Sequence, residues 1–236
     1  MKILINYADK LFLKAQQNNT ISGLKYGFDK VIEYKRGDID NEFCTKNAYI
    51  LNKTRGAGYW LWKPYFILKT LELAKDDDVI FYADSGSDFI DSISPLIDLC
   101  REDTRGTLLF RYPHLVMGEF AKRDAFYYTD CDIEEYHRGK VWVAGFQVYR
   151  KTKFALEFVR EVLHYCCDSR IITDDPNVCG LPNLPIFQDN RHDQTVLSLM
   201  AIKHNITPHK NPQCECEDPE SLDTYGQIIY LHRNNA

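Results

Sequence analysis

The stretch Val79-Ile80-Phe81-Tyr82-Ala83-Asp84-Ser85-Gly86-Ser87-Asp88 decides the fold class of this chain. A short, continuous apolar run, residues 79–83, is followed at once by carboxylates, hydroxyls and a glycine. Such a run of β-branched and aromatic residues is typical of a strand buried on both faces, as in parallel sheets covered by helices. We therefore expect a buried strand that ends at Asp84.

The segments on either side of this strand alternate between strand and helix patterns. Strands are predicted at residues 2–7, 31–34, 107–112, 141–149 and 227–231, and helices at residues 9–18, 41–53, 64–75, 153–166 and 192–204. This alternation predicts an α/β fold with a central mixed, mostly parallel sheet flanked by helices. Because no repeat, low-complexity segment or linker divides the chain, residues 1–236 are expected to form one domain.

Composition excludes several classes of partner and location. With 29 Lys and Arg against 34 Asp and Glu, the net charge of -5 offers no basic field for nucleic acid. The first apolar run is too short for a signal peptide, and no window reaches the roughly 18 apolar residues of a membrane span. Because the eight cysteines are scattered, we expect reduced thiols in a soluble, cytoplasmic protein.

Asp84 is the first candidate site residue, because ligands of open α/β sheets bind beyond the carboxyl ends of strands. Together with the hydroxyls of Ser85 and Ser87 and the flexible Gly86, its carboxylate suits a hard divalent cation that bridges phosphate oxygens. The alternative is a capped turn, in which Asp84 and the serines bond only to their own backbone.

A second candidate is Arg191-His192-Asp193-Gln194-Thr195, which precedes an apolar helical run. Asp193 is either a helix N-cap, a position that aspartate favours, or a carboxylate that binds sugar hydroxyls together with the Gln194 amide. Both interpretations stay open on the sequence alone.

Two further segments carry chemistry. The last strand leads directly to His232 and Arg233, an imidazole ligand and a guanidinium that pairs with phosphate. Upstream, Arg55-Gly-Ala-Gly-Tyr-Trp-Leu-Trp-Lys-Pro64 places two glycines, which permit close backbone approach, before two tryptophans and Lys63. Aromatic rings of this kind also make stacking platforms for sugars and bases.

Together these segments resemble a family of GT-A (Rossmann-like) glycosyltransferases found in bacterial surface-polysaccharide loci and in large algal viruses that glycosylate their capsid proteins. The resemblance spans most of the chain. It rests on Tyr7-Ala8, Arg55–Pro64, Phe81-Tyr-Ala-Asp-Ser-Gly-Ser87, Val141-Trp-Val-Ala-Gly-Phe146, Arg191–Thr195 and Leu231-His-Arg233.

The resemblance implies an enzyme that transfers a hexosyl or deoxyhexosyl group from a nucleotide sugar, expected to be a UDP-sugar, to a glycan or protein-linked glycan. Mn²⁺ or Mg²⁺ is the implied cofactor. The implied nucleotide-binding residues are Asn6, Tyr7, Ala8, Arg55, Trp60, Lys63, Asp84, Ser85, Gly86 and Arg233. The implied metal ligands are Asp84, Asp88 and His232. The implied substrate-binding residues are Trp142, Gly145, His192, Asp193 and Gln194, with Asp84 and Asp193 catalytic.

The chain departs from the family motif at one position. The motif has two aspartates separated by one residue, whereas Gly86 occupies the second position and the next carboxylate is Asp88. Asp88 is then expected to reach the ion directly or through water, unless a backbone group replaces it. The same glycine disfavours a phosphatase with Asp84 as nucleophile, and a non-catalytic nucleotide-sugar or carbohydrate-binding module remains the alternative function.

Overall fold

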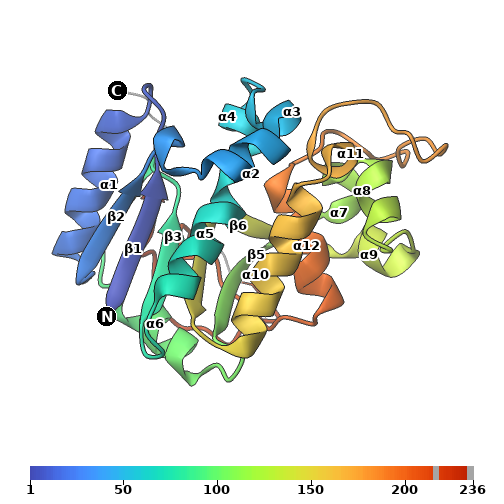
Figure 1. The fold of residues 1–236 in the computed structure, drawn as a ribbon. Helices are drawn as coiled ribbons and strands as arrows, with labels where there is room; N and C mark the ends of the chain where they lie inside the picture. The colour runs from blue at the N-terminus through green and yellow to red at the C-terminus, as the bar shows by residue number, and fades with distance from the viewer. Residues whose placement is uncertain (215–217, 233–236) are drawn as a thin grey trace.

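This computed structural model describes residues 1–214 and 218–232, and a twisted β-sheet runs through its centre (Figure 1). Its strands are β1 (Lys2–Tyr7), β2 (Lys30–Tyr34), β3 (Val79–Ala83), β5 (Thr107–Val116), β6 (Lys140–Arg150) and β7 (Pro208–His209). In the described residues they lie in the order β2-β1-β3-β6-β5-β7, with β6 antiparallel to both of its neighbours and the other pairs parallel. A small antiparallel sheet joins β4 (Ser87–Phe89) to β8 (Ile229–Leu231).

Helices cover both faces of the sheet because its strands are apolar on both sides. On β1, Ile3 and Ile5 belong to one core cluster and Leu4 to the other, as the two-residue period of a strand requires. Helices α5 (Trp62–Leu73), α10 (Lys153–Cys166) and α12 (Asp193–Lys203) supply the first cluster, and α6 (Ser94–Glu102) supplies the second. The expected α/β fold, with a mixed, mostly parallel sheet flanked by helices, is confirmed.

The remaining helices, apart from the 13-residue α1, are short, and most of them escaped prediction, as did α6. They are α1 (Leu13–Lys25), η1 (Arg36–Asp38), α2 (Asn41–Lys46), α3 (Ala48–Leu51), α4 (Gly56–Tyr59), α7 (Met117–Phe120), α8 (Arg123–Tyr128), α9 (Glu134–Arg138) and α11 (Ser169–Ile172). The helix expected at residues 9–18 begins later, at Leu13, and the one expected at residues 41–53 is divided at Asn47. Helices of one turn are too short to show a 3.6-residue period, so periodicity alone does not reveal them.

Two observations bear on the expectations of reduced thiols and of no membrane span. Within the part of the chain that the structure describes, six cysteines carry free thiols, namely Cys44, Cys100, Cys131, Cys166, Cys167 and Cys179. Cys214, in contrast, is disulfide-bonded, which departs from the expectation of reduced thiols throughout. Over the described residues, no helix has both the length and the apolar character needed to cross a membrane.

Candidate functional site

A cavity of about 650 Å³ opens where β1 and β3 end, next to the first turns of α5 and α12. This is the place where parallel strands of an α/β sheet present their ligand sites. Most of the residues expected from the sequence line it, namely Tyr7, Ala8, Arg55, Trp60, Lys63, Asp84, Ser85, Gly86, Gly145, His192, Asp193 and Gln194. Segments that lie far apart in the sequence therefore meet at one edge of the sheet.

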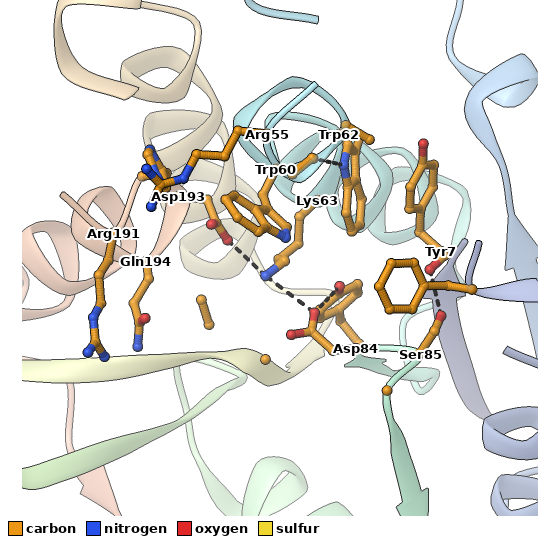
Figure 2. A pocket seen from close by; sticks show the side chains of 18 of the residues that line it. Tyr7, Arg55, Trp60, Trp62, Lys63, Asp84, Ser85, Arg191, Asp193 and Gln194 are labelled. Atoms are coloured by element: carbon orange, nitrogen blue, oxygen red, sulfur yellow. Dashed lines mark hydrogen bonds and ion pairs between the residues drawn. The ribbon is translucent and has the colours of Figure 1, made fainter. Parts of the chain in front are cut away.

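Lys63 joins the two principal aspartates of this cavity. Its Nζ lies 2.9 Å from Asp193 Oδ2 and 3.4 Å from Asp84 Oδ1, and its side chain is only 4% exposed. Figure 2 shows the resulting chain of contacts from Asp193 through Lys63 to Asp84. Burial alone would favour the neutral amine, but the charges of Asp193 and Asp84 raise the Lys63 pKa above its usual value. Lys63 is therefore a buried cation held between two carboxylates.

Asp193 is the more buried of the two aspartates and is the first residue of α12. Its side chain is 7% exposed, and burial raises the pKa of its carboxyl to about 6, against the opposing effect of Lys63. His192 occupies the N-cap position of α12 and makes no side-chain cap. Because the Asp193 carboxylate contacts Lys63 across the cavity, the geometry favours a role in the site over the helix-cap interpretation.

Asp84 presents one oxygen to the protein and the other to the cavity. The Tyr82 hydroxyl donates a 2.5 Å hydrogen bond to Asp84 Oδ1. Asp84 Oδ2 lies beside Gly145 of β6, where a Cβ would come within 3.1 Å of it. The absence of a side chain at position 145 keeps this oxygen accessible, and the Asp84 side chain is 37% exposed.

Ser87 bonds within the turn, as the capped-turn interpretation expected, whereas Ser85 bonds to a neighbouring strand. Ser87 Oγ donates to the Asp84 carbonyl at 2.6 Å, and Ser85 Oγ donates to the Tyr7 carbonyl at 2.5 Å. The second bond ties the end of β3 to the end of β1. Since the hydroxyls hold the turn, the Asp84 carboxylate is left to face the cavity.

The expected metal ligands fit a divalent cation only in part. The oxygen donors of Asp84 and Asp88 and the imidazole of His232 are suitable in kind, and His232 Nε2 lies 3.7 Å from Asp88 Oδ1. Asp84, however, contacts Lys63 and Tyr82. Among residues 1–214 and 218–232, no three histidine, cysteine or acidic side chains gather as a metal site.

The tryptophan-rich segment forms an aromatic wall along the cavity. The Trp62 ring stacks on Tyr7 with centroids 3.8 Å apart, and its Nε1 donates to the Gly56 carbonyl at 3.0 Å. Trp60 stacks on His192 with centroids 5.4 Å apart. Only glycine suits position 58, because its φ is +102° and a Cβ would lie 2.7 Å from Leu51 Cα. The glycines of the motif therefore allow the tight turn that presents these rings.

Backbone strain concentrates around the same wall. Ala57, Tyr59 and Trp60 have φ values of +51°, +52° and +58°, and His192 has φ +56° with ψ -118°. Each left-handed non-glycine residue costs on the order of 1 kcal/mol or more, and such strain clusters at ligand sites. His192 accordingly combines a strained backbone with a ring packed against Trp60.

Of the expected site residues that the structure describes, four do not line the cavity: Asn6, Asp88, Trp142 and His232. The Asn6 side chain is buried between β1 and α1. Its amide donates to Asn19 Oδ1 and its Oδ1 accepts from Gln16, so its polar atoms are already hydrogen-bonded within the fold. Trp142 is buried in the core, and its carbonyl accepts a 2.7 Å hydrogen bond from Gln194. Arg233 lies outside the described residues.

Sequence reasoning missed Tyr82 although a signal for it exists. Side chains two residues apart on a strand point to the same face, so Tyr82, two residues before Asp84, is expected to lie beside it. Burial and the neighbouring Asp84 charge raise the Tyr82 pKa well above its usual value, which keeps its hydroxyl protonated and donating. Its hydrogen bond holds one oxygen of the Asp84 carboxylate in place.

Comparison with known proteins finds similarity among solved structures, but no matching family model or curated protein. Among solved structures, the chain is similar to mouse xyloside xylosyltransferase 1 in its apo form, with a TM-score of 0.47 and 10% sequence identity. The alignment covers 99% of this chain and 97% of the mouse chain.

Proposed function

We propose that this protein is a GT-A glycosyltransferase that transfers a sugar from a UDP-sugar to a glycan or protein-linked glycan. The observation that supports this most is the buried Asp193 carboxylate, whose pKa of about 6 suits a general base near neutral pH. It faces the strand-end Asp84 across a cavity of about 650 Å³, a volume in the range of small-molecule sites.

The residues that line the cavity suggest where each of the two substrates lies. The nucleotide takes the end formed by Tyr7, Ala8 and Ser85, where β1 and β3 finish, and the transferred sugar lies between Asp84 and Asp193. Trp60 offers an aromatic surface beside that sugar. The acceptor then enters from the side of Asp193 and Gln194.

The reaction follows from this spatial arrangement of donor and acceptor. The acceptor hydroxyl attacks the anomeric carbon of the donor, a new carbon–oxygen bond forms, and the bond to the diphosphate breaks. Asp193 accepts the hydroxyl proton, and the diphosphate leaves with the bonding electron pair. Lys63 keeps Asp193 ionised and fixes its distance from Asp84, which is the positioning that efficient transfer needs.

A divalent cation, Mn²⁺ or Mg²⁺, stays part of this proposal. We propose Asp84, with Asp88 and His232, as its protein ligands. When bound, such an ion would supply positive charge to the diphosphate leaving group.

The alternative is a non-catalytic module that binds nucleotide sugars or glycans in the same cavity. The arrangement of Asp193, Lys63 and Asp84 favours the enzyme, because it places a buried carboxylate with a raised pKa beside the cavity, where a general base is needed. Incubation with a panel of UDP-sugars, with UDP release as the readout, separates the two. The enzyme releases UDP from at least one donor, faster when glycan acceptors are present, whereas a module releases none.

Replacing Asp84 by asparagine should abolish donor hydrolysis and transfer while leaving the thermal melting temperature near that of the wild type. The reason is that Asp84 is partly exposed and faces the cavity rather than the core. The matched control is Tyr82→Phe, which removes only the hydroxyl that orients Asp84 and should cost about tenfold in rate. Near-normal activity in Asp84→Asn would show that Asp84 is only a turn residue.

A further inference from the structure

The cavity extends beyond the catalytic pair to a cation that the proposed reaction does not use. Arg191 and Gln194 both line it, and Figure 2 shows their side chains next to each other, with Lys63 and Asp84 between them and Tyr7 and Ser85. Arg191 thus lies at the end of the cavity opposite the proposed nucleotide end.

The Arg191 guanidinium is held in place by packing rather than by a carboxylate. Its central carbon lies 3.8 Å from the centroid of the Phe120 ring, a cation–π contact that orients the planar group. The backbone N–H of Arg191 donates to Thr195 Oγ1 at 3.1 Å and to the Phe120 carbonyl at 3.2 Å. The side chain therefore projects from a fixed base.

Charge pairing distinguishes Arg191 from the other cations of the cavity. Arg55 pairs with Asp174 at 2.9 Å, and Lys63 pairs with both catalytic aspartates. Across the described residues, the Arg191 guanidinium forms no ion pair, so its donors are left for a ligand. A guanidinium binds carboxylate or phosphate through two parallel hydrogen bonds.

We infer that Arg191 forms an anion subsite for the acceptor, so that the acceptor is an acidic glycan whose carboxylate or phosphate group pairs with this guanidinium. This inference rests on the proposed function for the direction in which donor and acceptor lie. An anionic ligand at Arg191 has two possible sources, the acceptor or the donor diphosphate. The position of Arg191 beyond Asp193, away from Tyr7 and Ser85, favours the acceptor.

The test compares methyl β-D-glucuronide with methyl β-D-glucoside, two sugars that differ in one carboxylate, by NMR titration of the intact protein. The wild type should bind the glucuronide at least about tenfold more tightly, which corresponds to one charge-assisted contact. Arg191→Met, which keeps an apolar chain on Phe120, should erase the difference, and Arg191→Lys should retain part of it. Equal or undetectable binding of the two sugars by the wild type would overturn the inference, as would an undiminished preference in Arg191→Met.

Two controls separate the sources of binding. Arg170 also stacks on a ring, that of Tyr128 at 3.6 Å, but it pairs with Asp168 outside the cavity, so Arg170→Met should keep the glucuronide preference. UDP affinity should be unchanged in Arg191→Met, and a tenfold loss would assign the guanidinium to donor phosphate and overturn the acceptor subsite. If no UDP-sugar is turned over while the Arg191-dependent preference is present, the proposed transfer fails and the anion subsite stands.

Discussion

Replacing Asp193 by asparagine is expected to lower the transfer rate by a factor of about 100 to 10,000, the range that a positioned general base contributes. The amide keeps the shape of the side chain but cannot accept the acceptor proton. UDP affinity should stay nearly intact, because the proposed arrangement puts Asp193 beside the transferred sugar rather than the phosphates. Steady-state turnover with saturating donor and acceptor, beside a UDP titration, measures both effects.

The pH dependence gives an independent check on Asp193. Its carboxyl has a pKa of about 6, so the ionised base is present above that pH and is lost below it. Wild-type turnover should therefore rise as the pH increases through about 6 and then level off. If Asp193→Ala instead spares turnover across this pH range, Asp193 takes no part in the reaction.

Lys63→Met is expected to lower the free energy of unfolding by about 3 kcal/mol or more at neutral pH. The substitution removes the cation of a buried ion pair and leaves the Asp193 carboxylate buried without its partner. Lys63 also opposes the rise of the Asp193 pKa. Its loss should therefore move the rise in turnover to higher pH in whatever fraction of the variant folds. Urea unfolding and the pH profile measure the two effects.

Two further variants decide whether charge is the cause. The double variant Lys63→Met with Asp193→Asn removes both charges of the pair and should recover part of the lost stability. Lys69 pairs with Asp40 at 3.2 Å on the surface of the same helix, so Lys69→Met should cost less than about 1 kcal/mol. Wild-type stability in Lys63→Met would contradict the bridging role of Lys63.

The sequence predicts those site residues whose positions follow from the pattern of their neighbours in the chain. Asp84 ends a buried apolar strand, and Asp193 stands at the start of an apolar helix, so each position follows from its own neighbours. The bridge between them does not, because Lys63 reaches both aspartates only after α5 and α12 pack on one face of the sheet. No pattern within a single segment carries that information.

The direction of the side chains accounts for the remaining differences between the predicted and the observed site residues. Asn6 belongs to the strand that leads into the cavity, but its side chain turns to α1 and is used by Gln16 and Asn19. Trp142 lies in the segment that contains Gly145, yet its ring packs in the core. The segments expected around the site are present, and the face that each residue presents depends on packing between them.

The most direct test of the central claim is isothermal titration of the intact protein with UDP, once with Mn²⁺ and once with EDTA. UDP should bind with Mn²⁺ present and at least about tenfold more weakly with EDTA, a difference of about 1.4 kcal/mol. Asp84→Asn should weaken the Mn²⁺-dependent binding, and Arg170→Met, outside the cavity, should not. Equal affinity in Mn²⁺ and EDTA would contradict the metal assignment, and the absence of UDP binding under both conditions would contradict the proposed UDP-sugar transferase itself.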